Sequence, residues 1–525
     1  MIQRIVALAL ALALLAPVAA QADWHEASTD HFVVYYDGSA ERAGRFAADL
    51  ERFDKALRVA RGIATTPPGS ANRVTVYVVS TTDAVEALSR RNNVAGFYIG
   101  RAGGPLAVVP RRSGDGDKND LSANAVLQHE YAHHFMFSSW PAAAFPSWFI
   151  EGFAEFHATA VVDTDGGVVL GAPPQYRAHS ILNGNWLPLD KLLVAETLRL
   201  RNDDRGALYG RGWLLTHYLS FSEARRTQLT TYLNAINAGK TSLDAAQVFG
   251  DLKQLDRELE RYKLSRFAMR KVKPESIKLG EVKVRALREG EAAIMSVRIR
   301  SKVGVNAETA PGVYARALKA AAPYPNDPAV QVVLAEAAYD ARDYAAAEAA
   351  ADRAIAADAK AIDAHVYKAM SKMALARQAK DRTPATWSAI RKIITTANRL
   401  DPDDPEPLIL FYRSYAMAGL PPTENAKKGL MYAFGLAPFD MGLRMNAAMM
   451  QLRDGKLAEA REMLRPIAYN PHGGSRSAAA AKIIARIDAG NAKTADIAAE
   501  PDQDEDADPN GDPDKDKGKA GDPPA

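Results

Sequence analysis

The sequence predicts a chain in two parts, an α+β domain followed by an all-α array of helical repeats. Three observations lead to this prediction. The chain of 525 residues is longer than one hydrophobic core normally organises, so two or more domains are expected. The clearest β-branched and aromatic runs lie before residue 113, and mostly helical spacing follows them. From about residue 311 the composition becomes rich in alanine with a recurring spacing.

Composition and charge narrow the class of protein. Hydrophobic residues make up 47% of the chain and charged residues 25%, as in a globular protein. The formal net charge of +3 is small for this length and gives no reason to expect nucleic-acid binding. There is no cysteine, which excludes disulfides and thiolate metal sites. Any metal must therefore be held by histidine and carboxylate side chains.

Residues 1–22 have the layout of a secretory signal peptide. Arg4 precedes an apolar run to about residue 20, and Ala20-Gln21-Ala22 is a small-x-small cleavage site. An uncleaved anchor is the alternative, but the run is short for the roughly 20 residues that a membrane span requires. We expect a periplasmic or secreted protein without a stable membrane anchor, and the lack of cysteine favours the periplasm.

The α+β domain is expected to cover residues 23–270. Two β-branched and aromatic runs, at 31–37 and 73–80, are predicted strands, and the segment between them has helical spacing that ends at Gly62. A third extended run, at 103–112, is expected to be an edge strand along which a peptide could pair its backbone. The rest of the domain is expected to be mostly helical.

Residues 271–310 are expected to form short strands in a connecting segment of open role, and residues 311–490 the helical repeats. Small and aromatic residues recur at offsets 0, 9, 12, 19 and 34: Ala335, Tyr344, Ala347, Ala354 and Ala369. This spacing resembles that of tetratricopeptide repeats, about four of them, and implies a surface that binds a protein partner. A generic helical bundle is the alternative.

Residues 491–525 are rich in Asp, Pro, Gly and Lys without apolar periodicity, and we expect an acidic disordered tail. Asp506, Asp508 and Asn510 mimic the start of a calcium loop, but the twelfth position is Lys517 rather than glutamate. A solvated tail is the better interpretation.

The chemistry of the chain is predicted by His129-Glu130-x-x-His133, on a segment with helical spacing and Asp120 or Ser122 as the helix cap. Histidines four apart share one helix face and can bind one metal ion, while Glu130 lies about 100° away and can reach a water. The alternative is that both histidines are ordinary helix residues, so a third ligand is needed.

Glu151, in the segment PSWFIEGFAEF, is the candidate third ligand. Gly152 beside it lacks a side chain and is expected to let the motif helix approach closely. Glu155 lies one turn further on the same face, where we expect it to accept the N–H of a ligand histidine and orient its ring.

Together, the two motif parts resemble the gluzincin metallopeptidases, and most nearly the bacterial peptidase-MA-like group. The resemblance covers roughly Thr29–Arg270. It implies a zincin-type α+β catalytic domain, Zn²⁺ held by His129, His133 and Glu151, and Glu130 as the general base.

Peptide hydrolysis at such a site needs a proton acceptor and a donor for the developing oxyanion. Glu130 would take the proton of a water that zinc acidifies and pass it to the leaving amine. Tyr209 stands where related families carry a tyrosine that stabilises the oxyanion, with His217 and Tyr218 as competing candidates. A role for none of the three is also open.

Related aminopeptidases carry a glutamate in the edge-strand region, which binds the substrate's free amine. No glutamate lies between Glu86 and Glu130, so the sequence favours internal cleavage. Three loop aspartates, Asp115, Asp117 and Asp120, are possible substitutes but are expected to be solvated.

The sequence therefore predicts an exported zinc endopeptidase with a helical-repeat module. His134 and His157, which lie off the ligand faces, are expected to be structural. The alternative function is a non-catalytic periplasmic repeat scaffold with a structural or inactive zincin domain, because resemblance of fold alone does not establish catalysis.

Overall fold

The computed structural model describes residues 24–90, 94–111, 122–182, 187–195 and 202–490. The expected signal peptide, the three loop aspartates and the acidic tail with its calcium-like segment lie outside these ranges. None of the helices in the described part of the chain has the length and apolarity needed to span a membrane.

The first part of the chain is built on a six-stranded sheet with the order β4-β5-β3-β2-β1-β9. β2, β3 and β5 run parallel, whereas β1, β4 and β9 pair antiparallel with their neighbours. The strands are β1 (Trp24–Ser28), β2 (Phe32–Asp37), β3 (Val74–Val79), β4 (Phe97–Ile99), β5 (Leu106–Pro110) and β9 (Lys283–Ala286). The predicted runs at 31–37 and 73–80 are thus β2 and β3, which pair in the centre.

Alternate residues of these strands face two different helical layers. Val34 and Val76 pack with α2 and α4 on one face, while Tyr35 and Tyr77 pack with α3 and α12 on the other. Because both faces are covered, the central strands β2 and β3 are mostly apolar and show no regular alternation with polar residues.

Helices form the rest of this part: α2 (Ala40–Arg61), α3 (Thr82–Ser89), α4 (Ala123–Ser139), α5 (Ser147–Ala158), α6 (Ala178–Leu182), α7 (Leu189–Leu192), α8 (Asn202–Phe221), α9 (Arg226–Asn237), α10 (Ser242–Ala245) and α11 (Leu252–Tyr262). α2 ends at Gly62 as predicted, because φ of 66° there is a conformation that glycine adopts without strain. A small antiparallel sheet, β6 (Val161–Val162), β7 (Val168–Leu170) and β8 (Arg270–Val272), closes the domain.

The prediction that the run at 103–112 is the edge strand is wrong. Its strand, β5, lies between β3 and β4 and is buried along its whole length. The edge beside α4 is formed by β4, whose three residues are too few to give a clear sequence signal.

The connecting segment at 271–310 also differs from the prediction. β9 (Lys283–Ala286) joins the main sheet beside β1, but residues 289–303 form helix α12 (Glu289–Val303). This helix packs on the sheet through Met295 and Ile299 and on the helical array through Ile294 and Val297. When a helix has apolar residues on two sides, apolar and polar residues can alternate along its sequence as they do in a strand.

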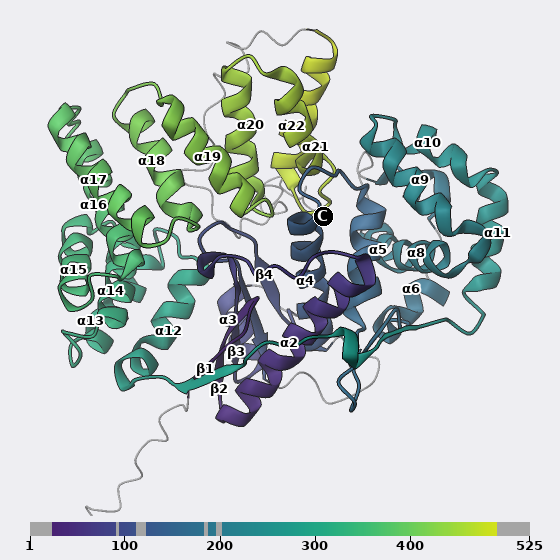
Figure 1. Ribbon diagram of the computed structural model, residues 1–525, viewed down its shortest axis with the longest axis horizontal. Helices are drawn as coiled ribbons and strands as arrows, with labels where there is room; N and C mark the ends of the chain where they lie inside the picture. The colour runs from purple at the N-terminus through teal and green to yellow at the C-terminus, as the bar shows by residue number, and fades with distance from the viewer. Residues whose placement is uncertain (1–23, 91–93, 112–121, 183–186, 196–201, 491–525) are drawn as a thin grey trace, which may run out of the picture.

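Between residues 310 and 488, the described chain forms only helices and the turns that connect them, as predicted for the repeats. Antiparallel helix pairs form a curved array that starts beside the sheet and ends next to α4 and α5 (Figure 1). The helices after α12 are α13 (Ala310–Ala321), α14 (Pro328–Asp340), α15 (Tyr344–Ala357), α16 (Ile362–Gln378), α17 (Pro384–Leu400), α18 (Pro405–Met417), α19 (Glu424–Leu436), α20 (Met441–Arg453), α21 (Leu457–Ala468) and α22 (Gly474–Asp488). The alanines at the recurring offsets, Ala335, Ala347, Ala354 and Ala369, are completely buried.

The two parts share one of their hydrophobic clusters. Leu430 and Ala433 of α19 and Leu443 of α20 belong to the same buried cluster as the sheet and α4. Polar contacts reinforce this packing, since the side chain of Asp440 accepts a hydrogen bond of 2.8 Å from the backbone N–H of Ala102. The end of the array is therefore fixed against the α+β domain.

Candidate metal centre

The two motif histidines project from α4. Its first turn is capped by Ser122, whose hydroxyl accepts a hydrogen bond from the N–H of Ala125 at 3.1 Å. On this helix the Nε2 atoms of His129 and His133 lie 3.1 Å apart. The four-residue spacing thus brings both imidazoles to one point.

Glu151 reaches the same point from α5. Its side chain is 0% exposed, and its Oε2 lies 3.4 Å from Nε2 of His129 and 3.8 Å from Nε2 of His133. Ligands about 2.0–2.1 Å from a tetrahedral zinc ion are separated by roughly 3.3 Å. The three side chains are therefore spaced as ligands of one ion.

The lack of aligned hydrogen bonds at these side chains also fits a bound cation. Both carboxylate oxygens of Glu151 and Nδ1 of His133 are buried without an aligned hydrogen bond in the described part of the chain. A buried charge without hydrogen bonds costs several kcal/mol, and proteins normally pair such a charge or use it to coordinate metal. The donor set of two imidazoles and one carboxylate is one that zinc favours.

Burial and the charges that face one another shift the pKa values of the cluster. Burial alone would raise the pKa of Glu151, but His472, His133 and His129 hold it well below its ordinary value. Burial lowers the pKa of His133 to about 3, which keeps that imidazole neutral and its lone pair available. The pKa of the Glu130 carboxyl is raised, by burial first and then by the neighbouring carboxylates.

Glu155 lies behind His129, on the side away from Glu151. Its Oε1 is 3.5 Å from Nδ1 of His129, which is long for a hydrogen bond, and the side chain is 1% exposed. Arg177 binds the same carboxylate through two nitrogens, at 2.8 and 3.1 Å, and the hydroxyl of Tyr176 donates to it at 2.9 Å. Neither partner was identified from the sequence, because both follow a loop without a motif.

Gly152 permits the close approach of a different helix from the one predicted. A Cβ at this position would lie 2.3 Å from the carbonyl oxygen of Gly212 and 2.3 Å from Oγ1 of Thr216, both in α8. The glycine therefore permits close packing of α5 against α8 and not against the motif helix. α8 in turn carries Tyr209, so this packing places the tyrosine near the candidate ligands.

Tyr209 is the one of the three oxyanion candidates that lies at the cluster. Its ring centroid is 5.9 Å from that of His129, and the guanidinium of Arg177 lies 4.6 Å from its ring. Burial, followed by the charges of Glu151 and Glu130, raises the pKa of its hydroxyl. The phenol therefore remains a hydrogen-bond donor at physiological pH.

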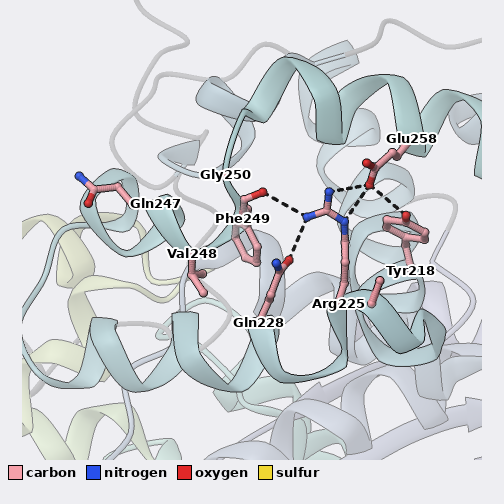
Figure 2. A pocket seen from close by; sticks show the side chains of 9 residues that line it. Tyr218, Arg225, Gln228, Gln247, Val248, Phe249, Gly250 and Glu258 are labelled. Carbon is pink, nitrogen blue, oxygen red and sulfur yellow. Dashed lines mark hydrogen bonds and ion pairs between the residues drawn. The ribbon is translucent and has the colours of Figure 1, made fainter.

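His217 and Tyr218 have other partners. The imidazole of His217 is buried between the hydroxyl of Tyr262 at 2.8 Å and the carbonyl oxygens of Ala268 and Gly171 at 3.0 and 3.1 Å. Tyr218 donates to Glu258 at 3.0 Å and lines a separate shallow pocket beside α9 and α11 (Figure 2). Neither residue belongs to the metal cluster.

The two further histidines point away from the cluster. Nδ1 of His134 is 2.6 Å from the hydroxyl of Tyr98 on the edge strand β4. Nδ1 of His157 donates to the carbonyl oxygen of Phe153 at 2.7 Å, and the ring is buried.

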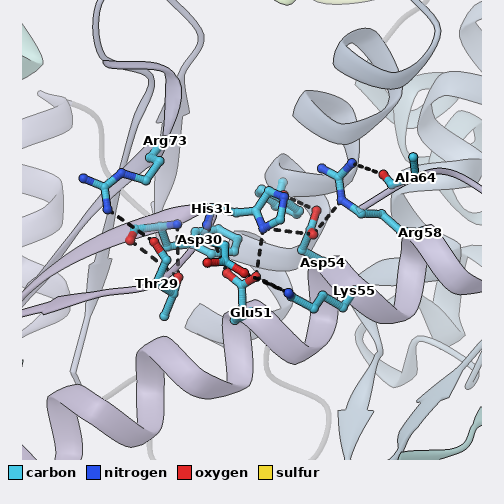
Figure 3. Close-up of polar contacts among 11 residues, drawn as sticks. Thr29, Asp30, His31, Glu51, Asp54, Lys55, Arg58, Ala64 and Arg73 are labelled. Carbon is cyan, nitrogen blue, oxygen red and sulfur yellow. Dashed lines mark hydrogen bonds and ion pairs between the residues drawn. The ribbon is translucent and has the colours of Figure 1, made fainter. Parts of the chain in front are cut away.

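A second group of metal-ligating residue types, His31, Glu51 and Asp54, is buried between β2 and α2 (Figure 3). Its charges are already balanced: Lys55 lies 3.5 Å from Glu51, and Arg58 lies 2.7 Å from Asp54. His31 Nδ1 is also hydrogen-bonded, at 2.8 Å, to Glu51. We interpret this group as a structural ion-pair network.

This network positions α4, which carries the two motif histidines. Tyr131 stands between the two motif histidines in the sequence. Its hydroxyl donates a hydrogen bond of 2.6 Å to Oδ1 of Asp54. α4 is thereby fixed to α2 on the side opposite the metal cluster.

One residue at the cluster comes from the helical array. His472, in the turn between α21 and α22, has its Nε2 2.8 Å from Oε1 of Glu151. Its ring centroid lies 5.8 Å from that of His133. This histidine was not identified from the sequence, since no motif surrounds it.

No protein-family model and no curated protein matches the chain. A thermophilic TPR protein of Thermus thermophilus, TTC0263, is 17% identical over 37% of this chain and 99% of that chain, with a TM-score of 0.32. Tom70 of yeast is 14% identical over 60% of this chain and 69% of that chain, with a TM-score of 0.26. At such scores the function has to be argued from the site itself.

Proposed function

We propose that this protein is an exported zinc-dependent peptidase, with a zincin-type α+β domain and a tetratricopeptide-like helical array that binds protein. The observation that carries the proposal is the meeting of two imidazoles with a wholly buried carboxylate that has no aligned hydrogen bond. The proposed ligands of Zn²⁺ are His129, His133 and Glu151.

The proposed reaction assigns a role to each side chain. Bound zinc would supply a Lewis acid that acidifies water and polarises the substrate carbonyl. Glu130 accepts the proton of the attacking water and returns it to the leaving amine, a role that suits a carboxyl of raised pKa. Tyr209 donates a hydrogen bond to the oxygen on which negative charge develops. Glu155 orients the ring of His129.

The edge strand β4 offers a backbone with which an extended peptide can pair. It lies beside α4, and its far edge has no partner strand in the sheet as the structure describes it. Because no glutamate lies between Glu86 and Glu130 to hold a free amine, we propose internal cleavage rather than removal of N-terminal residues.

A second candidate function is a non-catalytic scaffold, in which the helical array binds a protein partner and the α+β domain is structural. The observation that favours it is the size of the array, which extends from residue 310 to residue 488 and shares a hydrophobic cluster with the first part. Curved arrays of helix pairs present long binding surfaces.

Metal analysis combined with Glu130→Gln separates the two functions. We expect the purified wild-type protein to contain about one zinc ion per chain and to release peptides from an envelope extract, as detected by mass spectrometry. Glu130→Gln should retain zinc and lose cleavage by about 10²-fold or more, since only the proton acceptor is removed. A wild-type protein that binds zinc but cleaves neither the extract nor a broad peptide library would support the scaffold.

A further inference from the structure

The contact between His472 and Glu151 joins the helical array to the proposed metal ligand. Nε2 of His472 lies 2.8 Å from Oε1 of Glu151, whereas Oε2 of the same carboxylate faces His129 and His133. The distance is that of an ion pair, although the atoms lack the alignment of a hydrogen bond. The carboxylate is therefore shared between the two histidines of α4 on one side and an imidazole of the array on the other.

The turn that carries His472 is internally ordered. The backbone N–H of His472 donates to Oδ1 of Asn470 at 2.9 Å, a local turn of the kind that asparagine favours. The hydroxyl of Ser477 donates to the carbonyl oxygens of Ile467 and Asn470, at 2.6 and 3.0 Å. These bonds join the end of α21 to the start of α22.

The turn is also attached directly to the helix that bears Glu151. The hydroxyl of Ser147, in the first turn of α5, donates to the carbonyl oxygen of Tyr469 at 3.0 Å. Ser147 is 1% exposed, so this bond is shielded from water. Glu151 lies one turn further along α5, which places the turn directly above the carboxylate.

Two buried arginines hold the array against the loop and helix ends around α5. Arg444 of α20 donates to the carbonyl oxygen of Pro141 at 2.8 Å, in the loop between α4 and α5. Arg465 of α21 donates to the carbonyl oxygen of Asn237 at 3.1 Å, at the end of α9. Charged donors bound to backbone carbonyls in a buried interface form a rigid connection.

We propose that His472 is a positioning residue of the metal centre, acting through Glu151 so that Oε2 stays directed at His129 and His133. The inference rests on the proposed zinc site. In consequence, the helical array is part of the metal centre and not only a binding module. A carboxylate ligand fixed at its second oxygen loses less rotamer freedom on metal binding, and removal of such partners typically weakens metal affinity 10- to 100-fold.

The test compares His472→Ala with His472→Gln in the full-length chain. Zinc affinity is measured by competition with a chelating dye, and the coordination geometry by the visible spectrum of the Co²⁺-substituted protein. We expect His472→Ala to weaken zinc binding about 10- to 100-fold and to alter the Co²⁺ spectrum. His472→Gln, whose amide can still donate to Oε1, should recover most of the affinity.

Arg461→Ala is the matched control for damage to the last helix pair. Arg461 pairs with Asp488 at 2.6 Å across α21 and α22, and it also contacts its chain neighbour Glu462. This variant should keep wild-type zinc affinity, and the melting temperature of each apo-protein reports folding independently.

The outcomes distinguish the inference from the proposed function. If the wild type binds zinc and His472→Ala binds it equally well with an unchanged Co²⁺ spectrum, the inference is wrong and the zinc site stands. If His472→Ala leaves zinc affinity unchanged but accelerates peptide cleavage, the turn is a cover over the site, which also contradicts the inference. A wild type without zinc affinity would overturn both.

Discussion

Gly152 of α5 lies directly against Gly212 of α8, so closely that a Cβ on Gly152 would be 2.3 Å from the Gly212 carbonyl oxygen. The reverse contact is similarly short, since a Cβ on Gly212 would be 2.6 Å from the carbonyl oxygen of Trp148. The obstructing atoms are backbone and cannot rotate away. This pair of glycines sets the distance between the helix that carries Glu151 and the helix that carries Tyr209.

We therefore predict that Gly152→Ala destabilises the protein by about 3 kcal/mol or more, because the extra methyl group forces two backbones apart. Chemical denaturation measures the free energy of unfolding. Gly429→Ala, in α19, is the control: its Cβ would meet only Leu408, at an ordinary 3.7 Å, and alanine favours helix by up to about 1 kcal/mol. Equal stability of Gly152→Ala and wild type would show that the two helices can separate without cost.

Tyr209→Phe tests the proposed oxyanion donor. The hydroxyl makes no proposed contact with the metal, so zinc affinity should be unchanged while kcat falls about 10²- to 10³-fold. Tyr218→Phe is the matched control. It removes a hydroxyl from the same helix, but that hydroxyl donates to Glu258 in the separate pocket of Figure 2. A loss of zinc affinity in Tyr209→Phe would instead indicate that the tyrosine supports His129.

Glu155→Gln tests the orientation of His129. The neutral amide keeps the shape of the side chain but removes the charge that faces Nδ1, so we expect zinc affinity to fall about 10- to 100-fold. Glu258→Gln is a close match, since Glu258 is also bound by one arginine, Arg225 at 2.7 Å, and one tyrosine hydroxyl. The zinc affinity of both variants is measured by competition with a chelator. A loss in Glu155→Gln alone would show that the effect comes from this ion pair and not from the loss of any ion pair.

The local features of the site followed from the sequence, whereas its long-range contacts did not. Four-residue spacing on a helix places His129 beside His133 whatever surrounds it, and a cap such as Ser122 is recognisable locally. The contact of His472 with Glu151 depends instead on how the helical array curves back over α5, which no local pattern encodes. The partner of Gly152 was misassigned for the same reason: small residues reveal a close approach but not the element that approaches.

Helix α12 is another element that the sequence did not predict correctly. The first turn of this helix is capped, since the Glu291 side chain accepts a hydrogen bond of 2.9 Å from the N–H of Arg288. The run from Met295 to Arg300 nevertheless alternates between apolar and polar residues like a strand, because the helix is buried on two sides by two different layers. Periodicity identifies an element reliably only when one face is buried.

A half-buried carboxyl in the helical array makes stability depend on pH. Burial, followed by the negative charge of Asp404, raises the pKa of Glu406 from 4.5 to about 8. Asp363 adds to this effect, while Lys302 and Arg101 oppose it. The folded chain therefore retains a proton between pH 4.5 and about 8 that the unfolded chain releases. Because the folded state binds more protons in this window, stability falls as pH rises through it.

Glu406→Gln should remove this dependence. The amide keeps the shape of the protonated side chain, so the variant and the wild type should have similar melting temperatures near pH 4.5, and the variant should become progressively more stable than the wild type up to about pH 8. Melting temperatures measured across this range provide the test. Glu424→Gln, whose side chain is 80% exposed on α19, controls for the loss of one carboxylate from the array. A constant difference between Glu406→Gln and wild type at every pH would contradict the prediction, because it would mean that Glu406 ionises alike in the folded and unfolded chain.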